Sequence, residues 1–479
     1  MNDAAFDLAI IGAGPGGYVT AIRAAHRGLR VALVEERECG GVCLQAGCIP
    51  TKTMIAAAGL WQRIRGAGDL GLQAQPATPN LPAIVARRQR VVRQLTQGVE
   101  YLLDKNRVRL MRGRGVLASA REITVEDAPG HPIDSIHEPR AIVLATGSRP
   151  AELPMARRDG IAILNSRDML ALEEPPPELL IIGGGYIGCE FASLFASLGS
   201  RVTLIEALPR LLPNLDAELG QGLERAFKKA GIQVILNAQV QKVEAADTVN
   251  VALADGRILA GTKLLVSVGR IPNTERLGLE KAGVKLDGRF IGINERMETN
   301  VPGIYAIGDV TGKLALAHVA SAQGRIVLDQ LATQPGHDKT PAAGGTGPSG
   351  LDYDTVPACV FTRPEVATVG LTDAEAVRRG WTVRVGRFPF LASGKALADG
   401  ETEGFVKLVA DAATGRLLGG HVLGAHAAEL IGPIALAVQL GATARQLSQT
   451  VFAHPTLNEV LIEAAEDIVG KPTHVISRP

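Results

Sequence analysis

Residues 7–17 read Asp-Leu-Ala-Ile-Ile-Gly-Ala-Gly-Pro-Gly-Gly, an apolar run that passes directly into a glycine-rich turn. A helical pattern follows to about Gly28, and a second apolar run from Val31 to Val34 ends at Glu35. A buried strand, a Gly-x-Gly-x-x-Gly turn, a helix and a strand ending in an acid are typical of a dinucleotide-binding unit. We therefore expect residues 7–35 to bind a dinucleotide.

Each of the three motif glycines in this turn has a physical purpose. Gly12 permits a tight turn, Gly14 lets the backbone approach a pyrophosphate, and Gly17 lets the helix pack closely on the strand. The helix N-terminus then faces the phosphates with its partial positive charge. Glu35 is placed to accept hydrogen bonds from a ribose. The alternative is a purely structural turn between strand and helix.

The same pattern returns 171 residues later. An apolar run over 179–182 precedes a second glycine turn, a helix to Leu198, and a strand over 202–205 that ends at Glu206. An acid at this place favours a free ribose 2′-hydroxyl, and the next basic residue is Arg210, so NAD is preferred over NADP. Two dinucleotides in one chain predict a flavin and a nicotinamide cofactor that exchange hydride. The three motif glycines of the second turn are Gly183, Gly185 and Gly188.

The amino-acid composition and net charge limit the classes of partner that the protein can bind. The 479 residues are 46% apolar and 21% charged, which is the balance of a folded globular protein. The net charge of +1 and 4% aromatic content argue against nucleic acid and anionic membranes as partners. No window holds roughly 18 apolar residues, and no targeting segment is visible, so we expect a cytoplasmic protein without a membrane span.

Two cysteines follow the first unit, at Cys43 and Cys48. On a regular helix a five-residue spacing rises about 7.5 Å, beyond the ~7 Å limit for a disulfide. A bridge therefore needs a distorted turn, which Gly41 and Gly47 would permit. In a reducing compartment such a strained pair would cycle between its two redox states. The alternative is two buried structural cysteines; zinc is disfavoured because a second ligand pair is lacking, and no metal is predicted.

The segment Gly-Gly-Val-Cys43-Leu-Gln-Ala-Gly-Cys48-Ile-Pro-Thr-Lys52 resembles the redox-disulfide segment of the flavin-dependent pyridine nucleotide–disulphide oxidoreductases. The resemblance covers essentially the whole chain. The His-Pro-Thr-Leu-x-Glu ending and the NAD-type acid resemble the branch that reoxidises dihydrolipoyl groups, the E3 components of 2-oxo acid dehydrogenase complexes. Further matching segments are 145–148, 268–274, 307–310 and 452–459.

The resemblance implies a fold, partners and a domain map. The fold class is α/β, with two Rossmann-like domains for FAD and NAD and a C-terminal α+β dimerisation domain. Expected partners are a second copy of the chain and the lipoyl domain of an E2 or H-protein. The implied regions are 1–150 for the first part of the FAD domain, 151–272 for the NAD domain, 273–333 completing the FAD domain, 334–352 as a flexible Gly/Pro-rich loop, and 353–479 for dimerisation.

The resemblance also implies residue roles. Cys43 would exchange with substrate, and Cys48 would lie next to the flavin as a thiolate. Lys52 would lie near the flavin N5, with Glu190 as its acidic partner. Tyr186 would cover the flavin at the nicotinamide site, and Asp309 would hold the ribityl chain. The other implied cofactor contacts are Gly115, Thr146, Gly147, Ser148, Ile187, Val240, Gly269, Arg270, Ala315, Leu316, Ala317 and His318.

His454 has the sharpest implied role. A dithiol must lose a proton before it attacks a disulfide, and histidine titrates near the working pH. Glu459 would orient His454, although Thr456-x-x-Glu459 also reads as a capping box that opens the last helix. In the family this histidine comes from the partner subunit, which implies a homodimer. The alternative for His454 is a histidine without function at a loop tip.

Some positions depart from the family pattern. Val42 replaces the usual Thr of the redox segment, and Phe452 stands where a second His is usual. Cys39, Cys189 and Cys359 are interpreted as packing residues, and the alternative for Cys39 is a side reaction with the redox pair under oxidative stress. Two other functions stay open: a related FAD enzyme acting on a different disulfide, and a catalytically silent flavin-binding subunit.

Overall fold

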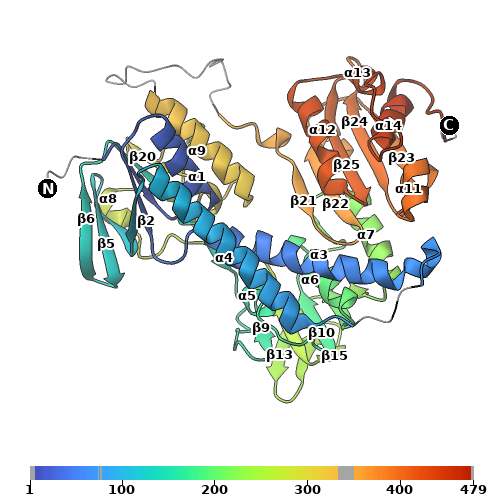
Figure 1. Ribbon diagram of the computed structural model, residues 1–479, viewed down its shortest axis with the longest axis horizontal. Helices are drawn as coiled ribbons and strands as arrows, with labels where there is room; N and C mark the ends of the chain where they lie inside the picture. Colours follow the sequence, from blue (N-terminus) through green and yellow to red (C-terminus); the bar gives the residue numbers. More distant parts are fainter. Residues whose placement is uncertain (1–5, 74, 76–77, 333–349, 476–479) are drawn as a thin grey trace. The chain divides into compact units, whose positions relative to one another are not determined.

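The computed structural model describes residues 6–73, 75, 78–332 and 350–475 (Figure 1). The chain forms two compact units, each assembled from stretches that are separated in the sequence. The first unit comprises Met1–Thr53, Val85–Ala151 and Arg270–Tyr353. The second comprises Met54–Ile84, Glu152–Gly269 and Asp354–Pro479. The finer boundaries expected from the sequence stay a prediction, and the predicted loop over 334–352 falls almost wholly outside the described residues.

The first unit is built around a parallel sheet with helices and a small antiparallel sheet. Helices α3 (Cys48–Arg65) and α4 (Leu81–Lys105) begin in one unit and end in the other. The other elements of the first unit are β1 (Leu8–Ile11), α1 (Pro15–His26), β2 (Val31–Glu35), α2 (Gly41–Ala46), β3 (Arg109–Arg112), β4 (Arg114–Ser119), β5 (Glu122–Ala128), β6 (His131–His137), β7 (Ala141–Leu144), β8 (Ser148–Pro150), β17 (Arg270–Pro272), α8 (Leu279–Ala282), β18 (Leu286–Asp287), β19 (Phe290–Ile291), β20 (Ile304–Ala306), η2 (Gly308–Thr311) and α9 (Ala317–Ala332).

The five strands of the main sheet run in the order β20-β7-β1-β2-β3 and are all parallel. Successive residues of β1 point to opposite faces, so Leu8 and Ile10 enter one buried cluster while Ala9 and Ile11 enter another. A strand buried on both faces explains the unbroken apolar run from which the sequence predicted it. The glycine turn follows the carboxyl end of β1, where the strand order reverses.

Helices α1 and α9 pack side by side against this sheet (Figure 1). Their approach is so close that a Cβ at Gly324 would lie 1.8 Å from the Thr20 hydroxyl. The backbone at Gly324 can therefore approach α1 only because it carries no side chain. This contact fixes the helix that begins at the glycine turn.

The second unit also contains a five-stranded parallel sheet, and it has a five-stranded antiparallel sheet in addition. Its parallel strands run β12-β11-β10-β16-β9, and its antiparallel strands run β21-β22-β25-β24-β23. The elements are η1 (Ala67–Leu70), β9 (Ile163–Leu164), α5 (Ser166–Met169), β10 (Glu178–Ile182), α6 (Tyr186–Ser197), β11 (Arg201–Ile205), α7 (Ala217–Lys229), β12 (Gln233–Ile235), β13 (Val240–Ala245), β14 (Val249–Leu253), β15 (Ile258–Gly261), β16 (Lys263–Val266), β21 (Ala358–Val360), β22 (Glu365–Gly370), α10 (Asp373–Arg378), β23 (Val383–Pro389), η4 (Phe390–Ala392), α11 (Gly394–Asp399), β24 (Phe405–Asp411), β25 (Leu417–Gly424), α12 (Ala427–Gln439), α13 (Ala444–Ser448) and α14 (Glu459–Val469), with η3 (Tyr353–Thr355) at the junction of the units.

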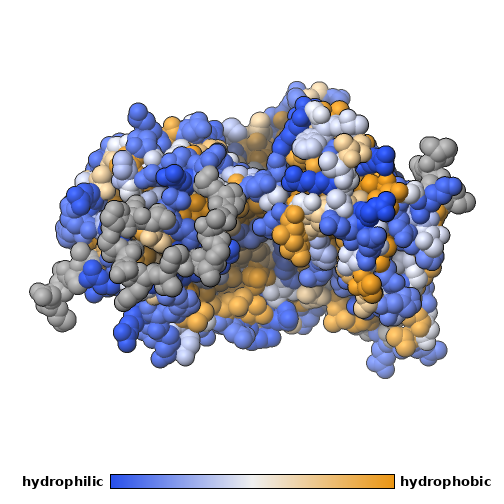
Figure 2. Space-filling view, turned by 90° about the horizontal axis from the view of Figure 1, so that it is seen from above, coloured by the Kyte–Doolittle hydropathy of each residue, from blue (hydrophilic) through white to orange (hydrophobic). Residues whose placement is uncertain are grey.

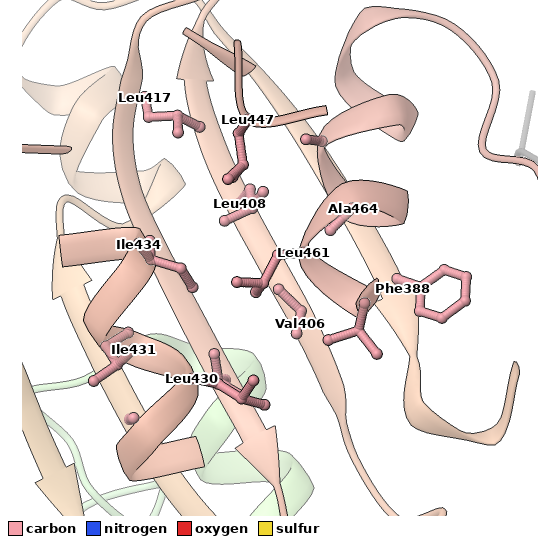
Figure 3. Close-up of a cluster of buried hydrophobic side chains, with 14 of the residues drawn as sticks. Phe388, Val406, Leu408, Leu417, Leu430, Ile431, Ile434, Leu447, Leu461 and Ala464 are labelled. Atoms are coloured by element: carbon pink, nitrogen blue, oxygen red, sulfur yellow. The ribbon is translucent and has the colours of Figure 1, made fainter. Parts of the chain in front are cut away.

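The antiparallel sheet carries a large buried cluster of the second unit. Side chains of β24 meet those of α12 and α14, as Val406, Leu408, Ile434 and Leu461 illustrate (Figure 3). Phe452 also packs against this cluster. Burying an aliphatic side chain contributes about 1.5–3 kcal/mol, so this cluster is what holds α14 on the sheet.

Apolar side chains also reach the surface, where they lie among hydrophilic ones (Figure 2). In the C-terminal part of the second unit they include Leu436, Leu440 and Val451, the last of which is 94% exposed. Among the helices that the structure describes, none is long and apolar enough to cross a membrane.

A buried cluster of charges joins α7 to the antiparallel sheet. Lys407 of β24 is 1% exposed, and its Nζ lies 2.8 Å from Asp216 Oδ2 and 2.8 Å from Glu218 Oε1. Burial by itself would lower the pKa of Lys407, but hydrogen bonds to these carboxylates outweigh it and raise the pKa. His421 of β25 is fully buried with its Nε2 4.0 Å from Asp216 Oδ2. Asp216 also caps α7 by accepting from the Glu218 N–H.

We expect Lys407→Met to lower the free energy of unfolding by about 3–5 kcal/mol, because Asp216 would stay buried without its cation. Urea denaturation followed by circular dichroism measures this loss. Lys229→Met is the control, since Lys229 is exposed and 3.8 Å from Glu403, and such pairs contribute about 0–1 kcal/mol. Equal effects of the two substitutions would contradict the role of the buried cluster.

The same cluster predicts a loss of stability in acid. Hydrogen bonds from Arg387 and, against burial, from Lys407 lower the pKa of Glu218 from its usual 4.5 to about 2. The unfolded chain therefore binds a proton at Glu218 between pH 4.5 and 2 that the folded chain does not, and stability falls as the pH decreases through that window.

Thermal unfolding between pH 7 and 2 tests this window. Glu218→Gln should unfold at a lower temperature than the parent at pH 7, and the difference should shrink below pH 4.5. The exposed Glu244, which pairs with Lys242 at the surface, supplies the control Glu244→Gln. If the difference in unfolding temperature between the parent and Glu218→Gln stays constant with pH, the lowered pKa of Glu218 is contradicted.

Candidate active site

The first glycine turn leaves space for a ligand at only one of its three glycines. Gly12 has φ +104°, and a Cβ there would lie 2.4 Å from the Ala145 carbonyl oxygen. A Cβ at Gly17 would lie 1.8 Å from the Gly12 carbonyl oxygen. At Gly14 the nearest described atom beyond its neighbours is 3.8 Å from the Cβ position. The outer glycines therefore close the turn, and the middle one leaves the backbone accessible.

Helix α1 begins directly behind this turn. Gly14 is its N-cap, and no described side chain caps it, so its first N–H groups remain available to an anion. Glu35 braces the turn, because its Oε2 accepts from the Ala13 N–H at 2.7 Å and its Oε1 accepts from the Arg37 N–H. Burial raises the pKa of Glu35, and these two hydrogen bonds oppose the rise.

The second glycine turn repeats this geometry in the second unit. A Cβ at Gly183 would lie 2.5 Å from the Ser267 carbonyl oxygen, and one at Gly188 would lie 1.8 Å from the Gly183 carbonyl oxygen. At Gly185, the N-cap of α6, no described atom lies within 4 Å of the Cβ position. Glu206 accepts from the Gly184 N–H at 2.6 Å, as Glu35 does in the first turn. Both turns thus have the shape that a bound pyrophosphate requires.

Four predicted contact residues of the first unit come together beside the sheet. The Ser148 hydroxyl donates to Asp309 Oδ2, and Arg270 Nε donates to the same hydroxyl at 2.7 Å. Arg270 Nε lies 3.7 Å from Asp309 Oδ2. The Thr146 hydroxyl donates to the Asn273 carbonyl at 2.8 Å. Burial lowers the pKa of Arg270, while Asp309 and Cys48 oppose that effect, so the guanidinium lies within electrostatic reach of the redox segment.

The remaining predicted contacts of the first unit flank this cluster. Gly115 lies against Ile11, with a Cβ position 2.9 Å from that side chain. Gly147 has φ +69°. The buried Gln323 of α9 accepts from the Gly308 N–H at 2.6 Å, which ties the start of η2 to α9. Residues 315 and 316 precede α9, and Ala317 and His318 form its first turn.

The two cysteines lie on either side of a helix break. Helix α2 ends at Ala46, α3 begins at Cys48, and Gly47 separates them. Cys48 is exposed and Cys43 partly exposed, so the alternative of two buried structural cysteines is wrong. Both are thiols in this structure, and a hydrogen bond joins them. The break supplies the distortion that a bridge between these positions requires.

The groups around Cys43 change the pKa of its thiol. The hydrogen bond to Cys48 and burial raise the pKa of Cys43, and a charge on Cys48 raises it further, while Lys52 opposes the rise. The raised pKa of Cys43 means that this thiol gives up its proton less readily than an ordinary cysteine. Lys52 lies one turn after Cys48 on α3 and so faces the same side of that helix.

The redox segment is packed against the first glycine turn. Gly41 has φ +56°, and a Cβ there would lie 2.6 Å from the Gly14 Cα. Gln45 of α2 donates to the Cys39 carbonyl and to the Thr96 hydroxyl of α4. These contacts hold the redox segment beside the first glycine turn, and the position of the thiols relative to a flavin stays a prediction. Cys39 is fully buried, which confirms its interpretation as a packing residue.

The predicted nicotinamide contacts lie in the second unit. Glu190 of α6 is buried, and its Oε1 accepts from the Phe361 N–H at 3.0 Å. Burial raises the pKa of Tyr186 to about 12, with a smaller contribution from Cys359. Ile187 follows Tyr186 in the first turn of α6, Val240 begins β13, and Gly269 precedes β17. The pairing of Glu190 with Lys52 joins residues of different units and stays a prediction.

His454 and Glu459 are in contact. His454 Nδ1 lies 2.8 Å from Glu459 Oε1, and His454 is 82% exposed. This bond leaves Nε2 to receive a proton. The hydrogen bond to His454 lowers the pKa of Glu459.

The expected capping box at Thr456 forms only in part. Glu459 Oε2 does accept from the Thr456 N–H at 2.9 Å. The Thr456 hydroxyl, however, donates to the Ala453 carbonyl, and Asn458 is the N-cap of α14. The prediction that the Thr456 hydroxyl caps α14 is therefore wrong, because that hydroxyl closes the turn that carries His454.

Several contacts have no counterpart in the sequence analysis. They include the bond from the Phe361 N–H to Glu190 and that from the Arg363 N–H to the Ser193 hydroxyl. They also include the pair of His474 with Glu463, whose Nδ1 and Oε1 are 2.6 Å apart. Residues 170 or more positions apart carry no common motif, so no sequence pattern indicates the first two. A histidine eleven residues after a glutamate has no periodicity that predicts the third.

Comparison with known families and structures agrees with this geometry. A family model described as pyridine nucleotide-disulphide oxidoreductase matches residues 6–324, and one for the dimerisation domain of that family matches 356–465. The chain belongs to the pyridine nucleotide–disulphide oxidoreductases. It is therefore an oxidoreductase with the predicted α/β fold class and a C-terminal dimerisation domain.

Individual relatives match over nearly their full length. Dihydrolipoyl dehydrogenase of Bacillus subtilis is 40% identical, with 98% of this chain and 99% of the relative covered. That of Zymomonas mobilis is also 40% identical at the same coverage. The crystal structure of LpdA from Mycobacterium tuberculosis has a TM-score of 0.87 at 34% identity, covering 96% of this chain and 98% of that one. The flavoprotein disulfide reductase RclA from Escherichia coli has a TM-score of 0.84 at 29% identity, covering 97% and 99%.

The residues present fit the family's cofactors, FAD and NAD. The fit rests on the two turns in which only the middle glycine is open and on the uncapped starts of α1 and α6. Within the described part of the chain, no group of three or more His, Cys, Asp or Glu side chains is gathered as metal ligands would be.

We expect Gly185→Val to raise the dissociation constant for NAD at least about tenfold, because the new side chain would fill the space that the pyrophosphate needs. The backbone there is extended, with φ −78°, so the chain should still fold and retain its flavin. Gly394→Val, at the similarly open start of α11, is the matched control. Titration of the holoenzyme with NAD measures the effect, and unchanged affinity would argue against the assigned site.

Proposed function

We propose that this protein is a dihydrolipoyl dehydrogenase that reoxidises protein-bound dihydrolipoyl groups with NAD, as the E3 component of a 2-oxo acid dehydrogenase or glycine cleavage complex. The observation that carries the proposal is the thiol pair of Cys43 and Cys48 at a helix break beside the first glycine turn. The names of the relatives support the substrate. The family match and the names of the relatives argue against a silent structural subunit.

The thiol exchange begins from the oxidised pair. One thiolate of the dihydrolipoyl group attacks Cys43 Sγ, the Cys43–Cys48 bond breaks, and Cys48 leaves as a thiolate. The second substrate sulfur then attacks the first, which releases the lipoyl disulfide and leaves Cys43 reduced. Two electrons pass from substrate to the cysteine pair. The raised pKa of Cys43 is consistent with its leaving the exchange as a thiol.

His454 of the partner subunit accepts the proton of the attacking thiol. Its Nδ1 is held by Glu459, which leaves Nε2 as the acceptor and stabilises the imidazolium that forms. A neutral dithiol reacts far more slowly with a disulfide than its thiolate does, so this proton transfer is required for rapid exchange.

FAD, when bound, would supply the chemistry between the thiols and nicotinamide, since a flavin can accept an electron pair and donate hydride. The residues that would hold it are the first glycine turn, Glu35, Lys52, and the cluster of Ser148, Arg270 and Asp309. The residues that would hold NAD are the second glycine turn with Tyr186, Ile187, Glu190, Glu206, Val240 and Gly269.

The remaining assignments concern partners and compartment. The dimerisation domain supports a homodimer in which each active site combines two subunits, and the lipoyl domain of an E2 or H-protein is the proposed substrate carrier. The cytoplasm stays the predicted compartment, because a strained cysteine pair that must cycle suits a reducing environment.

The purified flavoprotein should reduce NAD with dihydrolipoamide and should not oxidise NADPH with glutathione disulfide. Cys48→Ser should abolish dihydrolipoamide turnover, because Cys43 can then form no disulfide with residue 48. The flavin should stay bound in this variant. Cys39→Ala is the matched control, since Cys39 lies in the core of the same segment, and it should retain turnover. Parental activity of the Cys48→Ser variant would refute the mechanism.

The main rival is a related enzyme that acts on another disulfide. RclA, a flavoprotein disulfide reductase of similar structure, is an example of such an enzyme. Absence of dihydrolipoamide turnover in a protein whose flavin is bound and whose cysteine pair can be reduced would favour the rival. Rapid NAD reduction by dihydrolipoamide would exclude it.

A further inference from the structure

A fully buried glutamine joins three segments of the first unit. The Oε1 of Gln323, on α9, accepts a hydrogen bond from the Gly308 N–H at 2.6 Å, and its Nε2 donates to the Tyr353 hydroxyl at 2.8 Å. Because Gly308 supplies an N–H, the oxygen of the amide must face it, so the amide has one defined orientation. Both ends of the side chain are thus used, one on η2 and one on η3.

The Gly308 N–H belongs to the turn that presents Asp309. Gly308 is buried and has φ +78°, and its carbonyl accepts from the Thr311 hydroxyl at 2.8 Å. Asp309, the next residue, accepts from the Ser148 hydroxyl. Without Gln323 the buried Gly308 N–H would lose its acceptor, and the turn that orients Asp309 would have to rearrange to find another.

The same helix also contacts the first glycine turn. A Cβ at Gly16 would lie 3.1 Å from the Ala320 Cβ, and the Ser321 hydroxyl can donate to the Pro15 carbonyl oxygen, which is 3.1 Å away. These residues of α9 lie within one helical turn of Gln323. One stretch of helix therefore holds the predicted pyrophosphate turn on one side and the turn with Asp309 on the other.

We propose that Gln323 is a positioning residue for FAD: held by Tyr353, it fixes the Gly308 turn on α9 and so keeps Asp309 in place for the ribityl chain of the cofactor. The inference rests on the proposed function, from which it takes the assignment of Asp309 to the ribityl chain. Gln323 acts through Asp309, and α9 sets the spacing between the part of the site for the pyrophosphate and the part for the ribityl chain.

Replacing the amide has a defined effect on the affinity for FAD. Gln323→Met keeps a side chain of similar length but neither hydrogen bond, and it should raise the dissociation constant for FAD about tenfold. Gln323→Glu retains an acceptor for the Gly308 N–H and can accept from the Tyr353 hydroxyl, so it should restore the parental value. Tyr353→Phe removes only the outer bond and should raise the constant about threefold. Gln62→Met removes a bond to the Ser197 hydroxyl in the second unit, and as the matched control it should leave the constant unchanged.

The fluorescence of flavin released on dilution of the holoenzyme measures this constant. Competition by ADP in the same dilution series measures binding at the glycine turn alone, since ADP has the pyrophosphate but no ribityl chain. Gln323→Met should bind ADP as the parent does, whereas general damage to the unit would weaken both ligands equally. An unchanged constant for FAD, an equal loss in Gln323→Glu, or an equal loss for FAD and ADP would overturn the inference. If Gln323→Met does not fold, Tyr353→Phe decides in the same way.

A further variant separates this inference from the assignment that it uses. If Asp309→Ala binds FAD as tightly as the parent, Asp309 does not hold the cofactor and the inference falls with that assignment. If Asp309→Ala binds FAD more weakly and Gln323→Met does not, the inference alone falls. None of these measurements needs turnover, so absence of dihydrolipoamide activity in the parent would overturn the proposed substrate and leave the role of Gln323 standing.

Discussion

Backbone contact at two glycine turns is the constraint on which the rest of the structure depends. At Gly17 and Gly188 a Cβ would lie 1.8 Å from a carbonyl oxygen of the same turn, so helix and strand meet there as bare backbone. This fit brings the uncapped N-termini of α1 and α6 to the carboxyl edges of their sheets. It also leaves one open glycine in each turn. A dinucleotide site therefore results from packing that excludes side chains at two positions and tolerates a ligand at the third.

Acidic side chains then complete each turn from the next strand. Glu35 and Glu206 each accept a backbone N–H of the turn, which ties the glycine loop to the neighbouring strand. The redox segment builds on the first turn, since Gly41 packs on Gly14 and thereby places the helix break between Cys43 and Cys48. Cofactor site and thiol pair are thus parts of one packed arrangement in the first unit.

Buried and partly buried charges organise the second unit in a different way. Lys407 joins α7 to the antiparallel sheet through Asp216, and the row of glutamates on α14 holds two histidines. The Lys407 pair is buried, so removal of one partner would leave a charge that solvent screens poorly. The histidines of the two pairs on α14 are largely exposed, so these pairs fix the orientation of the imidazoles and contribute little to stability.

The sequence by itself determined the features that are local in the chain. The apolar runs, the two glycine turns and the break near Gly47 all follow from patterns within about thirty residues, where spacing translates directly into geometry. Only the tertiary structure decided how distant residues meet: the Ser148–Arg270–Asp309 cluster, the buried Lys407 and the His474–Glu463 pair. It also showed that the Thr456 hydroxyl closes the His454 turn and does not cap α14. Such contacts depend on how elements pack, and no periodicity in the chain encodes packing between segments far apart in sequence.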